Sequence, residues 1–448
     1  MAKSFFGTDG IRGTVNTENL NSEVALKLGL AAGKVFTRGD HKHRVIVGKD
    51  TRVSGYMLES ALESGFTSSG MDVFLTGPIP TPAVAYLTRA LRADLGVMIT
   101  ASHNTYEDNG FKLFGPNGYK LTDDKQSEIE ELMNREDIMR SQDKTVIGVA
   151  RRVNDALSRY IEFSKASFPN LMRLDHLKIV LDCANGAAYK VAPQILWELG
   201  ADVVVLGDKP NGRNINSECG TTYTQSIRKK VIEEKADVGI SLDGDADRLV
   251  IIDENGNQVD GDHLFAMIAL SLKSKNILKN NKVVSTIMSN VALEDYLKSI
   301  DLELVRAQVG DRYVIEDMMA HNSNFGGEPS GHLILSDYCT TGDAIISSLH
   351  VLALMCEQKK SISKLTNLFS LNPQIHDEFE YKKDNKITDS NIKRISKDID
   401  QQMNGKGRVV IRKSGTEPII RIMVEGNDPN FNKNIINNIK SSLKTLNY

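Results

Sequence analysis

The chain has 448 residues, of which 40% are hydrophobic, so it is too long for one ordinary core and is expected to fold as several packed domains. The chain has 55 Lys and Arg and 58 Asp and Glu, which gives a formal net charge of -3. This charge excludes a global positive field that would attract nucleic acid or an anionic membrane. We therefore expect neither a nucleic-acid nor a membrane partner, and we expect any anion binding to be local.

The N-terminus and the cysteines bear on where the chain works. Residues 1–10 contain one Lys and no apolar run of signal-peptide length, and no stretch reaches the roughly 20 apolar residues of a membrane span. The four cysteines are far apart and form no C-x-x-C pair, so they indicate neither a zinc site nor a disulfide framework. We expect a cytoplasmic protein.

Three times the chain shows an apolar strand, a loop, a helical pattern and a second apolar strand. The first strands are Arg44–Gly48, Lys178–Asp182 and Lys282–Thr286. The helical patterns cover 57–70, 187–199 and 291–300, and the second strands cover 72–75, 202–206 and 302–305. This alternation predicts an α/β protein with three related mixed α/β domains, whose sheets are mostly parallel.

The predicted boundaries follow from turns and a change of pattern. A helical pattern at 154–164 opens the second domain, and the polar turn 253–257 closes it. After a linker at 371–374 the pattern becomes helix, strand, turn, strand and helix, at 390–403, 408–411, 419–424 and 430–446. We predict α/β domains at 1–153, 154–254 and 255–370, and a smaller C-terminal α+β domain at 371–448.

The first loop of chemical interest is Thr100-Ala-Ser-His-Asn104, which follows the apolar strand 94–99. A serine at the carboxyl end of a strand in an open α/β sheet lies where such folds bind ligands, although a plain turn or helix cap is also open. Ser102 and His103 could suggest a hydrolase. Neighbours in an extended segment face opposite ways, however, and no G-x-S-x-G elbow surrounds the serine, so hydrolase chemistry is disfavoured.

The second loop, Asp243-Gly-Asp-Ala-Asp-Arg248, lies between two apolar strands. Two unit charges about 4 Å apart repel by roughly 4 kcal/mol at an effective dielectric of 20, so three carboxylates crowded here need a cation. Oxygen ligands without His or Cys select magnesium over zinc. The EF-hand alternative is disfavoured, since its sixth position is Arg248 and its flanks are strands. A solvated acidic turn remains open, and we expect the loop at the surface.

The third loop, Gly326-Gly-Glu-Pro-Ser-Gly-His332, places a carboxylate, a hydroxyl and an imidazole close together. Sugar hydroxyls need such acceptors and donors, and glycines let the backbone come close. A plain turn would have a similar sequence.

The fourth loop, Arg412-Lys-Ser-Gly-Thr-Glu-Pro418, closes a predicted hairpin and has Arg421 on the return strand. Two arginines, two hydroxyls and the backbone N–H groups around the glycine make a phosphate cradle. The alternative is a basic surface turn.

Taken together and in this order, the four loops resemble the α-D-phosphohexomutase superfamily, and most closely its phosphoglucosamine branch. The resemblance begins with Phe6-Gly-Thr-Asp-Gly-Ile-Arg-Gly13, which is typical of that branch, and Val309-Gly-Asp-Arg-Tyr313 matches a further family segment. It covers nearly the whole chain, and four ordered motifs are far more specific than any one of them.

The resemblance implies a fold of four domains around a central cleft and a set of site residues. It implies that Ser102 carries the phosphoryl group, and that one Mg2+ per subunit is held by Asp243, Asp245 and Asp247 with an oxygen of phosphorylated Ser102. It assigns sugar binding to Glu328 and Ser330, and binding of the non-reacting phosphate to Arg412, Ser414, Gly415, Thr416 and Arg421. It lines the cleft with Arg12, His103, Lys112, Arg248 and His332.

Among these residues we expect Lys112 to be the general acid/base, because a nearby metal and arginines would lower its pKa towards the working pH.

The implied reaction is the reversible isomerisation of glucosamine 6-phosphate to glucosamine 1-phosphate. A phosphoserine enzyme and glucosamine 1,6-bisphosphate, which is both intermediate and activator, would connect the two, and the product would supply UDP-N-acetylglucosamine for the cell wall. The sugar phosphate is the expected partner, and a homodimer is a candidate assembly. A phosphomannomutase or phosphoglucomutase is the nearest alternative. A catalytically silent sugar-phosphate-binding protein is an alternative of another class.

The chain departs from the family pattern at two positions. Thr105 follows Asn104 where the family usually has proline, so proline does not enforce the turn after the serine. Pro329 stands in the sugar loop where the phosphoglucosamine branch usually has Gln. Neither departure removes a donor, an acceptor or a metal ligand.

Overall fold

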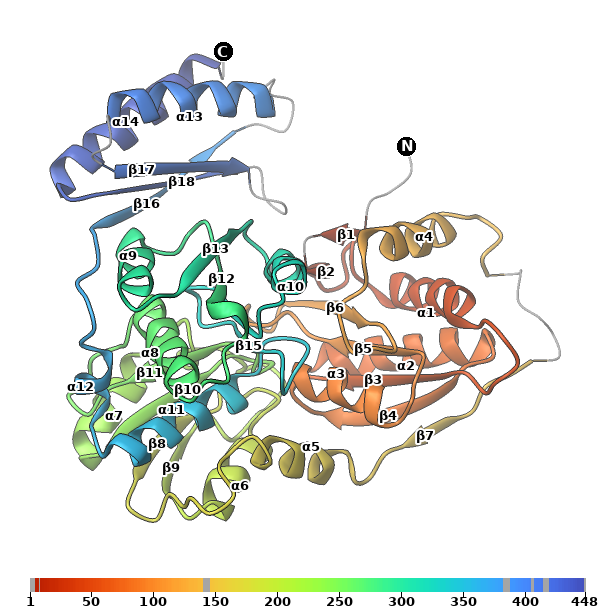
Figure 1. The fold of residues 1–448 in the computed structure, drawn as a ribbon. Coiled ribbons are helices and arrows are strands. Elements are labelled where there is room, and N and C mark those ends of the chain that lie inside the picture. The colour runs from red at the N-terminus through yellow and green to blue at the C-terminus, as the bar shows by residue number, and fades with distance from the viewer. Residues whose placement is uncertain are drawn as a thin grey trace.

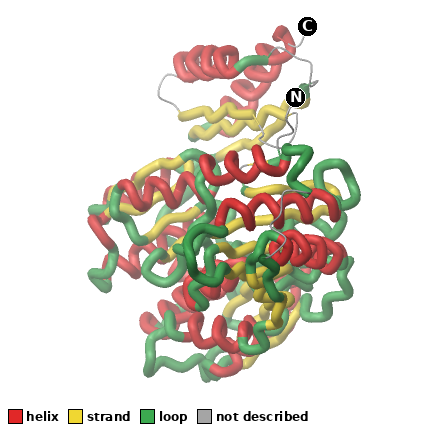
Figure 2. Tube along the Cα trace, turned by 90° about the vertical axis from the view of Figure 1, so that its right-hand side faces the viewer, coloured by secondary structure: helices red, strands yellow, loops and turns green. Residues whose placement is uncertain are grey.

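The computed structural model describes residues 5–7, 9–139, 146–381, 387–403, 407–413 and 419–446. Figure 1 shows four units: the first, red to orange, lies beside the second and third, and the C-terminal unit, blue, stands above the third. In the view turned by 90° (Figure 2) the C-terminal unit again lies at one end, with its helices on the outer face of its sheet.

The first unit is built on one sheet. Its strands are β1 (Phe6–Gly7), β2 (Gly10–Thr14), β3 (Arg44–Lys49), β4 (Asp72–Pro78), β5 (Leu95–Ile99), β6 (Asp108–Phe114) and β7 (Ala150–Arg152), in the spatial order β1-β2-β6-β5-β3-β4-β7. Its helices are α1 (Ser22–Phe36), α2 (Ser54–Ser68), α3 (Thr81–Ala90) and α4 (Asp123–Met133). Alternate side chains of β3 point to opposite faces, so Val45 and Val47 pack with α1, α2 and α4, while Ile46 packs with α3.

The second and third units each carry a four-stranded sheet. The second contains α5 (Ala156–Lys165), β8 (Lys178–Asp182), α6 (Val191–Glu198), β9 (Asp202–Leu206), α7 (Gln225–Glu234), β10 (Val238–Leu242) and β11 (Leu249–Ile252). The third contains α8 (Gly261–Ser274), the short helix η1 (Lys279–Asn281), β12 (Lys282–Thr286), α9 (Val291–Ser299), β13 (Glu303–Ala307), α10 (Asp311–Ala320), β14 (Phe325–Gly327), β15 (Leu333–Leu335), α11 (Ala344–Gln358) and α12 (Ile362–Thr366).

The three sheets share one topology, which confirms the prediction of three related α/β domains. In the second unit the order is β11-β10-β8-β9, in the third it is β13-β12-β14-β15, and the first unit contains β6-β5-β3-β4. In each set, three strands are parallel and the last one returns antiparallel. The serine loop, the acidic loop and the sugar loop each join the third strand of a set to this returning strand.

The C-terminal unit is a smaller α+β domain with one layer of helices and one sheet. It contains β16 (Gln374–Glu380), α13 (Asp389–Met403), β17 (Gly407–Lys413), β18 (Ile419–Gly426) and α14 (Pro429–Leu446). The three strands form an antiparallel sheet in the order β16-β18-β17. Both helices are amphipathic and cover one face of the sheet, where Ile395, Ile422 and Ile439 belong to one apolar cluster.

The apolar core connects the first three units and leaves the fourth separate. One cluster runs from Ile46 through Leu181 to Phe325, whereas the C-terminal unit has a cluster of its own. Polar contacts attach that unit to the third. In one of them the Arg408 guanidinium donates a hydrogen bond to the Ile287 carbonyl at 2.5 Å. Within the described ranges, no helix has the length and apolar character needed to cross a membrane.

One helix begins later than its pattern predicts. The prediction placed a helix at 187–199, but α6 begins at Val191. The Ala187 N–H donates to the Gly244 carbonyl at 2.8 Å instead of starting the helix, so the intervening residues form turns that pack against the acidic loop.

Candidate active site

Ser102 lies on the loop from β5 to β6 and is 1% exposed. Its backbone is left-handed, with φ of 50°, so the expectation of an extended segment is wrong. Its hydroxyl donates to Asp243 Oδ2 at 2.7 Å, and its Oγ lies 3.4 Å from His103 Nδ1. The serine of the first unit is thus joined directly to the acidic loop of the second.

Arg52, which sequence reasoning missed, holds the serine loop in place. Its side chain is fully buried, and its guanidinium donates to the carbonyls of Ser102 at 3.0 Å and Asn104 at 2.8 Å. It also donates to the Thr105 and Asp108 carbonyls and pairs with Asp50. These bonds fix the turn where proline is missing. The sequence signal for Arg52 is that it comes just after the carboxyl end of β3, at the sheet edge where Ser102 follows β5.

The acidic loop joins β10 to β11, and its carboxylates are buried, not at the surface as we expected. Asp243 and Asp245 are 0% exposed and Asp247 is 3% exposed. The serine and acidic loops can touch because Gly244 has no side chain: a Cβ there would lie 2.6 Å from the Ser102 carbonyl oxygen. The strand flanks rule against the EF-hand alternative.

Lys112 on β6 is the cation closest to these carboxylates. Its Nζ lies 2.8 Å from Asp245 Oδ2 and 2.6 Å from Asp247 Oδ2. Burial would lower the pKa of Lys112, but Asp245 and Asp247 outweigh burial and raise it well above its usual value. The sequence argument expected a nearby metal and arginines to lower this pKa, whereas the carboxylates of the acidic loop act in the opposite direction.

The acidic loop has the properties of a cation site. Oxygens of Asp243, Asp245 and Asp247 lie within 4.8 Å of one another. Burial and the two neighbouring carboxylates raise the pKa of Asp243 well above its usual value, so the cluster opposes full ionisation. Asp245 Oδ1 is buried and accepts no hydrogen bond from any described residue. Three carboxylates with a free buried oxygen fit a hard divalent cation.

The other residues predicted to line the cleft surround the same loop. Arg248 Nε lies 4.0 Å from Asp247 Oδ1, and His332 Nδ1 lies 3.6 Å from the same oxygen. Burial, Arg248 and Arg12 lower the pKa of His103 to about 4, so its imidazole is neutral at neutral pH. The structure therefore brings Arg12, His103, Lys112, Arg248 and His332 to one site.

Three further charged residues of this site were missed. Asp9 contacts Arg12 at 3.1 Å and also pairs with Lys120. Lys120 in turn lies 2.5 Å from Asp311 at the start of α10. Asp9 and Asp311 lie inside the two family-like segments, 6–13 and 309–313, which was the available signal.

The sugar loop joins β14 to β15 and is held to the start of α10. Glu328 Oε1 accepts the Gly310 N–H at 3.0 Å, and Glu328 Oε2 accepts the Ser330 hydroxyl at 3.1 Å. Gly310 has φ of 132°, which a side chain would disfavour. Glu328 also favours the charged forms of Arg248 and Arg412, so it lies between the acidic loop and the C-terminal unit.

Arg412 on β17 and Arg421 on β18 are directly opposite each other in the sheet. They line a cavity of 380 Å³ with residues that include His376 and Met288. Burial, followed by the charge of Arg421, lowers the pKa of Arg412. Like charges opposite each other are destabilising, so this pair favours an anion. The predicted Ser414, Gly415 and Thr416 lie outside the described residues.

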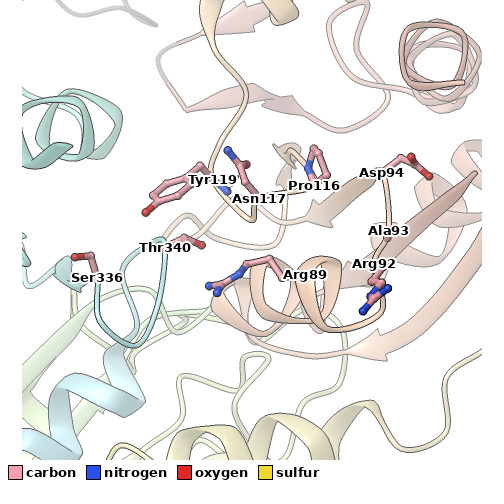
Figure 3. Close-up of a pocket in the computed structure, with 9 residues that line it drawn as sticks. All are labelled: Arg89, Arg92, Ala93, Asp94, Pro116, Asn117, Tyr119, Ser336 and Thr340. Atoms are coloured by element: carbon pink, nitrogen blue, oxygen red, sulfur yellow. Dashed lines mark hydrogen bonds between the residues drawn. The ribbon is translucent and has the colours of Figure 1, made fainter. Parts of the chain in front are cut away.

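A cavity of 530 Å³ is formed away from these loops, between the first and third units (Figure 3). Arg89 and Tyr119 line it from the first unit, and Ser336 and Thr340 line it from the third. None of the predicted site residues that the structure describes contributes to its wall.

Four models of the phosphoglucomutase/phosphomannomutase family match the chain in order. Alpha/beta/alpha domains I, II and III match residues 3–139, 158–256 and 260–371, and the C-terminal domain matches 371–439. The chain is also 51% identical over 444 residues to a Zymomonas mobilis protein named phosphoglucosamine mutase, and the alignment covers 99% of each chain.

Two solved structures have the same fold. A phosphoglucomutase/phosphomannomutase family protein from Burkholderia thailandensis has a TM-score of 0.82 at 22% identity, covering 99% of this chain and 97% of that one. N-acetylphosphoglucosamine mutase of Aspergillus fumigatus, in complex with GlcNAc-6P and magnesium, has a TM-score of 0.70 at 18% identity, covering 99% of this chain and 96% of that one. At these identities the likeness establishes the fold alone.

Proposed function

We propose that this chain, which belongs to the phosphoglucomutase/phosphomannomutase family, catalyses the reversible isomerisation of glucosamine 6-phosphate to glucosamine 1-phosphate. The observation that carries the proposal is the contact of Ser102 with Asp243, in which a serine hydroxyl bonds to one of three clustered, buried carboxylates. Relatives named phosphoglucosamine mutase, about half identical over nearly the full length, support glucosamine as the sugar.

In the proposed cycle the resting enzyme carries a phosphoryl group on Ser102. The bond from phosphorus to Ser102 Oγ breaks while the free hydroxyl of the sugar forms a new bond to phosphorus and loses its proton. The resulting glucosamine 1,6-bisphosphate turns over in the cleft, and Ser102 takes back the other phosphoryl group. The enzyme is then restored and the phosphate has moved between positions 6 and 1.

Asp243, Asp245 and Asp247 would hold Mg2+, one per subunit, with an oxygen of phosphorylated Ser102. When bound, the ion supplies positive charge beside the transferring phosphoryl group, whose stabilisation is most of the catalysis in this reaction type. Arg12 and Arg248 add fixed charge from the protein. His332 lies 3.6 Å from Asp247 and 3.5 Å from Asp311, and it is assigned the same role.

Proton transfer is assigned to Lys112. Its raised pKa keeps the amine protonated, so the ammonium gives a proton to the Ser102 oxygen as that oxygen leaves phosphorus. The proton that the sugar hydroxyl loses then returns to the Lys112 amine, so each transfer leaves the number of protons unchanged. The reverse transfer accompanies the second half of the cycle. His103, neutral and 3.4 Å from the same oxygen, orients the hydroxyl.

The sugar and its distal phosphate are assigned to the remaining loops. Glu328 and Ser330 would accept and donate hydrogen bonds to ring hydroxyls in both orientations of the sugar. Arg412 and Arg421, with Ser414, Gly415 and Thr416, would hold the phosphate that is not reacting. Because the C-terminal unit has a separate core, it can close on the cleft as a body.

The test is turnover by the purified protein on the phosphates of glucosamine, glucose and mannose. We expect the highest kcat/KM for glucosamine 6-phosphate. Preference for mannose or glucose phosphate would make the chain a phosphomannomutase or phosphoglucomutase, and binding without turnover would make it a silent receptor. The domain boundaries at 153, 254 and 370, the cytoplasmic location, the homodimer and the supply of UDP-N-acetylglucosamine remain predictions.

A further inference from the structure

Two histidines and a carboxylate meet at the edge of the first sheet opposite the serine loop. His41 and His43 precede β3, and Asp94 precedes β5. His41 Nε2, His43 Nδ1 and Asp94 Oδ1 all lie within 4.8 Å of one another. Because β3 and β5 are parallel, this cluster lies at their amino ends, whereas Ser102 follows the carboxyl end of β5. The full length of the strands separates the cluster from the proposed active site.

The buried histidine is the observation that points to a ligand. His43 is 6% exposed, and its Nδ1 has no hydrogen-bond partner among the residues that the structure describes. That nitrogen faces Asp94 Oδ1 at 3.6 Å, beyond hydrogen-bond distance. A buried imidazole nitrogen needs a partner, and its 3.6 Å distance from the carboxylate oxygen is close to the separation of two ligand atoms on one metal ion.

The carboxylate is already oriented for such a group. Asp94 Oδ2 accepts the Arg44 backbone N–H at 2.8 Å, which fixes the carboxyl plane and directs Oδ1 to the histidines. His41 Nε2 lies 2.7 Å from that Oδ1, and its side chain is 60% exposed, so it can rotate outward. Asp94 is one of the residues that line the cavity of Figure 3, and its carboxylate points away from Tyr119 and Thr340 on the other side.

We propose that His41, His43 and Asp94 bind a Zn2+ ion, with water at the fourth position. Zinc bonds of about 2.0 to 2.2 Å place tetrahedral ligand atoms roughly 3.3 Å apart, close to the present distances. Two imidazoles and one carboxylate select zinc over magnesium, whereas the three carboxylates of the acidic loop select magnesium. The chain thus carries two cation sites of opposite preference.

The zinc site joins a loop to the sheet. Residues 37–43 have no helix or strand, and the ion ties them to the start of β5, more than fifty positions along the chain. An ion that binds only the folded state raises thermal stability with its concentration. We therefore assign the site a structural role, without a part in the phosphoryl transfer.

The experiment uses the full-length protein, freed of metal by a chelator and then held in excess Mg2+ to occupy the acidic loop. Zn2+ is titrated by calorimetry, and the melting temperature is followed at each addition. We expect one Zn2+ per chain at micromolar affinity or tighter, with a rising melting temperature. Co2+ in place of Zn2+ should give the visible absorption bands of a four-coordinate site.

The variant His41→Asn removes one exposed ligand, and His176→Asn, also exposed, is the matched control. His41→Asn should weaken Zn2+ binding at least tenfold and abolish the zinc-dependent rise in melting temperature, while mutase activity is unchanged. The control should behave like the parent. Absence of Zn2+ binding, or binding that His41→Asn leaves intact, would overturn the proposal and make the cluster a hydrogen-bonded anchor only.

Discussion

Ser102 and Asp243 follow the third strand of the four-stranded set that their two sheets share, and their side chains meet in a hydrogen bond of 2.7 Å. The two loops occupy equivalent places in the related topology of the first and second units, and the sugar loop with Glu328 occupies that place in the third. Carboxyl edges of parallel strands are where α/β sheets bind ligands. One site is therefore assembled from the same edge of three sheets.

The first prediction concerns the modification of Ser102. The purified protein should be partly phosphorylated there, because each cycle returns a phosphoryl group to the enzyme. Mass spectrometry of the peptide that contains Ser102 checks this. Ser102→Ala should lower kcat by roughly 10³-fold or more, as loss of a nucleophile does. An unmodified peptide, in an enzyme fully active without added bisphosphate, would contradict the carrier role.

The second prediction concerns Asp245, whose carboxylate is fully buried between Lys112 and Thr81. Asp245→Asn should shift the Mg2+ dependence of activity to higher concentration and lower kcat, because one ligand charge is lost. It should also lower the free energy of unfolding by about 1 to 3 kcal/mol, since Lys112 loses one of its buried partners. Magnesium titration of activity and thermal unfolding measure the two effects. An unchanged Mg2+ response would mean that the carboxylates bind no catalytic ion.

The sequence predicted the strands and the loops better than it predicted how the loops meet. Runs such as Arg44–Gly48 are apolar and bounded by turns, so local pattern was enough to find β3. The burial of Asp243 depends on its contact with Ser102, 141 positions away, and no local pattern carries that information. Arg52 was missed for the same reason: its carbonyl partners come together only in the fold.

The third prediction tests Arg52 as a positioning residue. Lysine at this place keeps the charge but cannot reach the carbonyls of Ser102, Asn104 and Asp108 together. Arg52→Lys should lower kcat roughly 10- to 100-fold and change KM little, since the serine is displaced and the sugar contacts are not. The exposed Arg159→Lys is the control and should be silent. If Arg52→Lys lowers the amount of folded protein by the same factor as the activity, then Arg52 has only a structural role.

The fourth prediction concerns Glu328, which accepts hydrogen bonds from Gly310 and Ser330. Glu328→Ala should lower kcat/KM in both directions of the isomerisation by about 10-fold or more, because one loop contacts both orientations of the ring. Initial rates from glucosamine 6-phosphate and from glucosamine 1-phosphate give the comparison. A defect in one direction only would rule out the shared role.

The last prediction concerns Arg421, which lies opposite Arg412 in the sheet of the C-terminal unit. This pair is assigned to the distal phosphate, so it should retain the bisphosphate while the sugar reorients. Charge-assisted hydrogen bonds of roughly 1.5 to 3 kcal/mol correspond to about 10- to 150-fold in retention. Closing the unit on that phosphate would also exclude water and protect phosphorylated Ser102 from hydrolysis.

For Arg421→Ala we therefore expect a lower kcat, free glucosamine 1,6-bisphosphate in the medium, and partial rescue when bisphosphate is added. The exposed Arg394→Ala on α13 is the matched control in the same unit and should change none of these. Asp245→Asn should not be rescued by bisphosphate, since its defect lies in the transfer step and not in retention. Phosphorus NMR of the reaction medium measures the released intermediate. A rise in KM alone, without release or rescue, would make the arginine pair an ordinary affinity element, because binding energy used only for the ground state leaves kcat unchanged.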